Sequence, residues 1–141
     1  MTERLRLIAS LIENGRGVAD IGTDHGYIPA ALALGGYTGR IIAADINAGP
    51  LQCAEKTAAE TGVSEKIEFL LCDGLSKVEP SAVDTIVIAG MGGDTITGIL
   101  DRDYWCASPG YKLVLQPMSH QNVLRYWLIN NEFTITRELL A

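Results

Sequence analysis

The stretch VADIGTDHGYIP, residues 18–29, decides the fold of this chain. It opens with a short apolar run of strand length, and Gly22 and Gly26 then permit a tight turn that lets a ligand approach bare backbone. Pro29 follows where the first turn of a helix tolerates it, because its missing N–H costs nothing there. The stretch therefore predicts a strand, a glycine turn and a helix in direct succession.

The same alternation continues along the chain, with short apolar runs separated by segments of helical periodicity. Strands are predicted at residues 18–21, 41–44, 67–71, 83–89 and 112–115, with a sixth at 133–140, and helices at 5–12, 28–35, 49–61, 93–101 and 119–131. Strands that alternate with helices indicate βαβ units. The predicted fold is therefore α/β, with a Rossmann-like, doubly wound and mostly parallel sheet covered by helices on both faces.

The composition is typical of one folded domain spanning residues 1–141, because 48% of the residues are hydrophobic and 20% are charged. We expect neither a membrane-spanning segment nor a signal peptide, since apolar runs are short and the N-terminal stretch carries charges throughout. Cys53, Cys72 and Cys106 have the spacing of neither a disulfide framework nor a zinc site. A reducing, cytoplasmic location without a metal site is predicted.

The net charge of −6 at pH 7 narrows the possible partners. No basic cluster stands out, which argues against an extended footprint on a phosphate backbone. Any nucleic-acid function therefore needs cationic surface supplied from outside this chain.

Polar and glycine residues follow each predicted strand, where a parallel sheet of this kind binds its ligand. The candidate binding residues are Asp20, Gly22, Asp24, His25 and Gly26 after the first strand, Asp45 and Asn47 after the second, Asp73 and Gly74 after the third, and Ala89, Gly90 and Met91 after the fourth, with Asp94 close behind. Together along one edge, they predict a site for a nucleotide-type ligand.

Several of these residues could have a purely structural role in place of binding a ligand. Asp45 has the position of a carboxylate that binds both ribose hydroxyls, although Asp45 or Asn47 could instead cap the following helix. Asp73 and Gly74 could read an adenine edge or form a plain Asp-Gly turn. Tyr27 could stack on a flipped base or pack against the edge of the sheet.

The acidic residues of the first turn decide between nucleotides. A dinucleotide site prefers G-x-G-x-x-G, but Asp20 stands here in place of the first glycine and Asp24 lies within the turn. Two carboxylates repel a pyrophosphate, whereas they attract the amino group and sulfonium of S-adenosylmethionine. Electrostatics therefore favour S-adenosylmethionine over NAD.

These motifs resemble the class I S-adenosylmethionine-dependent methyltransferases and, more narrowly, the bacterial tRNA adenine-22 N1-methyltransferase family. The resemblance rests on ADIGTDHGYIP (19–29), AADINAGP (43–50), DGL (73–75), IAGMGG (88–93) and LQPM (115–118). It implies transfer of a methyl group to N1 of an adenine near the D-arm of tRNA, with S-adenosylmethionine as cofactor. A non-catalytic module that binds the same cofactor is the alternative.

The resemblance also implies roles for the candidate residues. Gly22, Asp24 and Gly26 would hold the amino-acid end and the sulfonium of S-adenosylmethionine, and Asp45 would bind its ribose, with Asn47 adjacent. Asp73 and Gly74 would contact its adenine, and Ala89 to Gly92 would line the pocket between the methyl donor and the acceptor base. His25 could bond the cofactor carboxylate or the target base. The carbonyls of Ala89 and Gly90, or the carboxylate of Asp94, are the candidate catalytic groups, because a nearby carbonyl or carboxylate would help while the cationic product loses a proton from N6. Asp94 could equally be a first-turn acid of the next helix.

The chain departs from that family in length. Its members carry a further helical C-terminal extension, and class I sheets usually have seven strands. We therefore expect residues 1–141 to be a truncated piece that lacks the last strand of the sheet and much of the surface that grips tRNA.

Overall fold

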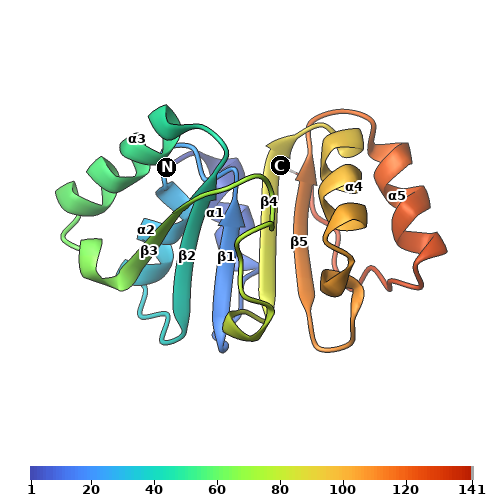
Figure 1. Ribbon diagram of the computed structural model, residues 1–141, viewed down its shortest axis with the longest axis horizontal. Coiled ribbons are helices and arrows are strands. Elements are labelled where there is room, and N and C mark those ends of the chain that lie inside the picture. The colour runs from blue at the N-terminus through green and yellow to red at the C-terminus, as the bar shows by residue number, and fades with distance from the viewer. Residues whose placement is uncertain (141) are drawn as a thin grey trace.

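The computed structural model describes residues 1–140, and within them five parallel strands form one sheet in the order β3-β2-β1-β4-β5 (Figure 1). The strands are β1 (Gly17–Ile21), β2 (Arg40–Asp45), β3 (Ile67–Leu71), β4 (Thr85–Met91) and β5 (Lys112–Pro117). The helices are α1 (Glu3–Ser10), α2 (Tyr27–Leu34), α3 (Ala48–Glu60), α4 (Gly93–Arg102) and α5 (Gln121–Asn130). The chain runs outward from β1 to β3 and returns to β4, so the predicted doubly wound α/β fold is confirmed.

Helices cover both faces of the sheet, as the apolar character of the strands requires. All five residues of β1 are buried, and successive residues point to opposite faces. Val18 joins the core beneath α1, α2 and α3, whereas Ala19 and Ile21 join the core beneath α4 and α5. The two layers of helices lie on either side of the sheet in Figure 1.

The connection between β3 and β4 contains one short 3-10 helix, Pro80–Ala82, and no α-helix. Leu75 and Val78 are buried in the same core as α4, so this segment lies against that helix. It thereby brings Asp73, at the end of β3, within reach of α4.

The predicted sixth strand at residues 133–140 is wrong. These residues adopt no regular secondary structure, and all of them after Phe133 are exposed. The Phe133 N–H donates to the Leu128 carbonyl and its ring packs on Trp127, so the chain turns back against α5. A strand needs a buried face, and a segment with one partly buried residue has none.

None of the helices within residues 1–140 is long and apolar enough to cross a membrane.

Candidate functional site

The turn between β1 and α2 winds tightly at the carboxyl edge of the sheet. Gly22, Asp24 and Gly26 all have positive φ, at 71°, 55° and 70°. The N–H groups of Gly22 and Thr23 both donate to the Ala44 carbonyl at 2.9 Å, which fastens the turn to the end of β2. Glycine adopts this backbone freely, whereas an aspartate there carries a conformational cost. The predicted glycine turn is present where the sequence places it.

Asp20 lies at the base of this turn and is 4% exposed. Its Oδ2 accepts a hydrogen bond from the Thr23 hydroxyl at 2.9 Å. Burial raises the pKa of Asp20 to about 7, the Thr23 hydroxyl opposes that rise, and the nearby Asp45 carboxylate adds to it. Near neutral pH this side chain therefore exists in both protonation states.

Asp45 ends β2 and is 7% exposed. Its Oδ2 accepts from the Asp24 N–H at 3.2 Å and its Oδ1 from the Asn47 N–H at 3.0 Å. Asn47, not Asp45, is the N-cap residue of α3, and its side chain makes no capping bond. Each Asp45 oxygen keeps a second lone pair, so the carboxylate can still accept from a pair of hydroxyls.

Asp20 and Asp45 form no ion pair with any cation among residues 1–140. Buried charges are normally paired, because leaving water without a partner is costly. Two neighbouring buried carboxylates without a cation therefore mark an edge of the sheet that suits a positively charged ligand.

The end of β3 is bound to α4 by a contact that the sequence analysis did not foresee. Arg102 donates from Nη1 to Asp73 Oδ2 and from Nη2 to the Asp73 carbonyl, both at 2.9 Å. A Cβ on Gly74 would stand 2.6 Å from Arg102 Nη2, so glycine permits this approach. Asp73 is thus held in one orientation, with Oδ1 left for another donor.

The glycine-rich end of β4 contains a β-bulge. Ala89 and Met91 pair with consecutive residues of β5, so Gly90 between them stands outside the ladder with φ of 83°. The end of the Met91 side chain lies over the first turn, because a Cβ on Gly22 would come within 2.4 Å of Met91 Cε. The segments after β1 and β4 therefore meet, as the sequence predicted.

The other candidate residues lie on exposed surface. Asp94 is exposed in the first turn of α4, whose N-cap is Gly92, and its side chain makes no hydrogen bond among residues 1–140. His25 stacks on Tyr27 with ring centroids 5.4 Å apart, and Tyr27 is 43% exposed. Tyr27 therefore keeps an open ring surface at the site.

Ile46 is a residue that the sequence analysis missed. It follows Asp45 directly and is 60% exposed, although it is a large apolar side chain. An apolar side chain beside a carboxylate that suits a ribose can pack on the face of the attached base. The signal was present in the sequence as an apolar residue directly after the acidic one.

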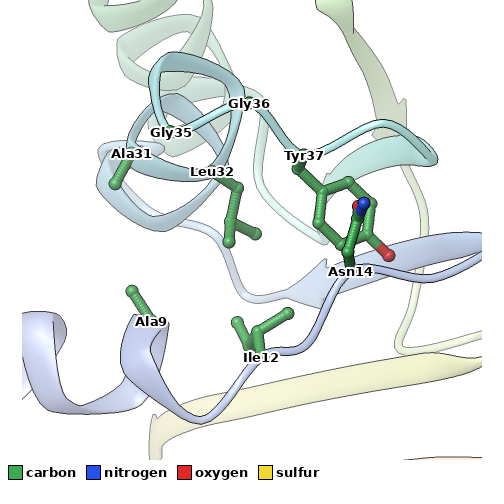
Figure 2. A pocket seen from close by; sticks show the side chains of 8 residues that line it. All are labelled: Ala9, Ile12, Asn14, Ala31, Leu32, Gly35, Gly36 and Tyr37. Atoms are coloured by element: carbon green, nitrogen blue, oxygen red, sulfur yellow. The ribbon is translucent and has the colours of Figure 1, made fainter.

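A hollow of about 380 Å³ lies elsewhere, between the ends of α1 and α2 (Figure 2). Ala9, Ile12 and Leu32 form its apolar wall, and Asn14 and Tyr37 stand at one side. It opens at the amino ends of the strands, because α2 runs back from the carboxyl edge toward the start of β2. None of the candidate residues lines it.

Comparison with known proteins agrees with this geometry. The chain is 33% identical over 140 residues to the tRNA (adenine(22)-N(1))-methyltransferase of Bacillus subtilis, an alignment that covers 99% of this chain and 59% of that protein. The crystal structure of the B. subtilis m1A22 tRNA methyltransferase TrmK superposes with a TM-score of 0.90, at 33% identity, over 99% of this chain and 59% of that one.

A second solved structure holds a ligand. Mycoplasma capricolum TrmK in complex with S-adenosyl-homocysteine superposes with a TM-score of 0.82, at 32% identity, over 99% of this chain and 62% of that chain. The chain thus spans about three fifths of the length of these relatives. The resemblance indicated by the motifs is confirmed. The family model described as a methyltransferase domain matches residues 1–141, so the chain belongs to the methyltransferase domain family.

Proposed function

We propose that this chain binds S-adenosylmethionine at the carboxyl edge of its sheet and serves in methyl transfer to N1 of an adenine in tRNA. The observation that carries the proposal is the pair of buried carboxylates, Asp20 and Asp45, which have no cation beside them within residues 1–140. The likeness to tRNA adenine-22 methyltransferases supports the same reading.

The residues at this edge fit such a cofactor in three respects. Asp20 offers negative charge for the amino group of the methionine portion, Asp45 keeps two lone pairs for the ribose hydroxyls, and Asp73 keeps Oδ1 for the amino group of adenine. Gly22 leaves its backbone bare, and the Met91 side chain above it is flexible enough to move aside.

The bound cofactor would supply an electrophilic methyl group on a positively charged sulfur. Adenine N1 carries a lone pair, so no base is needed to prepare it: the N1–methyl bond forms as the sulfur–methyl bond breaks. The product is cationic until N6 loses a proton. The carbonyls of Ala89 and Gly90 would accept hydrogen bonds from N6, and the carboxylate of Asp94, in the first turn of α4, would take that proton.

The remaining expectations become proposals of the same kind. His25 and Tyr27 form an exposed aromatic pair that could meet the entering base. Residues 1–141 would be the cofactor-binding domain of a protein that works in the cytoplasm, in keeping with three free cysteines. The tRNA would be held in part by residues outside this chain, since the net charge of −6 offers little to a phosphate backbone.

Calorimetry and nucleoside analysis test the proposal in two stages. We expect S-adenosylhomocysteine to bind and NAD not to bind; binding of neither would refute the whole site. Nucleoside mass analysis then follows incubation of a tRNA transcript bearing adenine at position 22 with S-adenosylmethionine. A transcript with guanine at that position is the control.

The incubation uses this chain and, in parallel, the chain extended by the part of the B. subtilis relative outside the matched region. We expect 1-methyladenosine from the adenine transcript alone. Binding without 1-methyladenosine in either protein would leave the non-catalytic binding module as the function.

A further inference from the structure

Residues 89–92, which are the last three residues of β4 and Gly92 after them, form the acceptor loop of the proposed reaction, and Gly90 among them has no ladder partner. Gly90 lies in the bulge between Ala89 and Met91. Glycine populates positive and negative φ about equally, so nothing intrinsic to Gly90 selects its observed φ of 83°. Some other contact must hold the loop in this conformation if the Ala89 and Gly90 carbonyls are to face a base.

That contact comes from the side chain of Gln116 on β5. The Gly90 N–H donates to Gln116 Oε1 at 3.1 Å, which replaces the ladder bond that the bulge removes. Oε1 also accepts from Arg4 Nη1 at 2.8 Å. Because both partners are donors, only the oxygen of the Gln116 amide can face them, so the amide has a single orientation.

The amide nitrogen of Gln116 is also engaged. It lies 3.4 Å from the Pro117 carbonyl oxygen and 3.2 Å from Met118 Sδ. The resulting Arg4–Gln116–Gly90 bridge joins α1, β5 and the bulge of β4. Arg4 is half-buried on α1, and 112 residues separate it from Gln116 in the chain.

We propose that Arg4 and Gln116 are positioning residues that fix the acceptor loop for the target adenine. They act through Gly90: the guanidinium orients the Gln116 amide, and the amide oxygen holds the Gly90 N–H. This inference rests on the proposed methyl transfer, and neither Arg4 nor Gln116 is among the residues assigned to the cofactor. It predicts a larger effect on the acceptor side of the reaction than on cofactor binding.

The test exchanges the acceptor oxygen at position 116. Gln116→Leu removes it, whereas Gln116→Glu keeps an oxygen that can accept from both Arg4 and Gly90. Arg4→Met removes the guanidinium and keeps the apolar stem, and Arg6→Met is its matched control, because Arg6 lies on the same helix with its side chain 65% exposed.

Three quantities are measured for each variant: hydrogen exchange of the Gly90 amide, affinity for S-adenosylhomocysteine, and kcat/KM for tRNA. Gln116→Leu should exchange the Gly90 amide about threefold to tenfold faster, as expected for one lost hydrogen bond. It should lower kcat/KM roughly 10- to 100-fold, the usual effect of a misplaced reacting group. Cofactor affinity should fall by less than kcat/KM, because Asp20, Asp45 and Asp73 lie outside the bridge.

Gln116→Glu should restore both the exchange rate and kcat/KM, and Arg4→Met should fall between Gln116→Leu and the wild type. Arg6→Met should match the wild type. Unchanged exchange at Gly90 in Gln116→Leu, or full methylation by that variant, would overturn the positioning role. If neither the wild-type chain nor its extended form makes 1-methyladenosine, the proposed methyl transfer fails, while the exchange measurement still decides whether the bridge holds the loop.

Discussion

Replacing Asp20 by Asn should make the protein more stable above neutral pH, by an amount that follows from the burial of this carboxyl group. The pKa of Asp20 is raised from 3.8 to about 7 in the folded protein. The folded state therefore binds more protons than the unfolded state between these values, and stability falls as the pH rises through that window. A shift of roughly three pKa units corresponds to about 4 kcal/mol.

Asn has no charge to bury and can still accept from the Thr23 hydroxyl, so Asp20→Asn should escape this loss. Urea unfolding from pH 4 to pH 8.5 measures the difference between variant and wild type. We expect that difference to grow with pH by about 4 kcal/mol and to level off above pH 8. Asp24→Asn, which removes an exposed carboxylate from the same turn, is the control for a change in net charge.

A difference between Asp20→Asn and the wild type that is the same at pH 5 and pH 8 would refute this reasoning. The same group gives a second readout, because a cationic ligand beside Asp20 favours its charged form. Binding of S-adenosylmethionine at pH 6 should release up to about 0.9 proton, as expected for a group with a pKa of about 7. Calorimetry in two buffers of different ionisation enthalpy measures this release, and Asp20→Asn should abolish it.

Other substitutions probe the rest of the site. Asp45→Ala should weaken S-adenosylhomocysteine binding in calorimetry by about 1–3 kcal/mol, through unpaired buried groups; unchanged affinity would mean that Asp45 only ties the loop together. Gly22→Val should abolish binding of S-adenosylhomocysteine. Its control is Gly62→Val, because Gly62 also has a positive φ, of 74°, but has no neighbour within 4 Å of an added Cβ. The control should lose similar stability in urea unfolding and still bind the ligand. Arg102→Met should weaken binding by about 0.5–1.5 kcal/mol and reduce discrimination against S-inosylhomocysteine; equal discrimination would mean that Arg102 is not needed to orient Asp73 toward the amino group.

The helices and the sheet could be predicted because their signals are local. The helix predicted at 93–101 is Gly93–Arg102, and the strand predicted at 41–44 lies within Arg40–Asp45. Strand 133–140 failed for a tertiary reason: its apolar alternation needed a buried face, and only Phe133 found one, against α5. Periodicity reports which residues alternate and not whether a surface is available to receive them.

The arrangement of the candidate residues was predictable to the same extent. Residues directly after strands must meet at one edge of a parallel sheet, which is why Asp20, Asp45 and the glycine turn could be named together. Arg102 on Asp73 and Arg4 on Gln116 could not be foreseen, because both arginines lie on helices far away in the sequence. The bulge at Gly90 could not be predicted from the sequence either. A run of glycines indicates that the backbone can adopt many conformations, but it does not indicate which one the backbone adopts.

The position of Asp20 on the central strand has a consequence for how the protein is made. Asp20 lies between Ala43 of β2 and Val87 of β4, which come from opposite halves of the polypeptide. During synthesis the first half can pair β1 with β2 and β2 with β3, while the flank of β1 that receives β4 is still unpaired. Because β4 supplies one of the two strands that flank Asp20, the burial that raises the pKa of this carboxyl group requires both halves of the chain to be folded together.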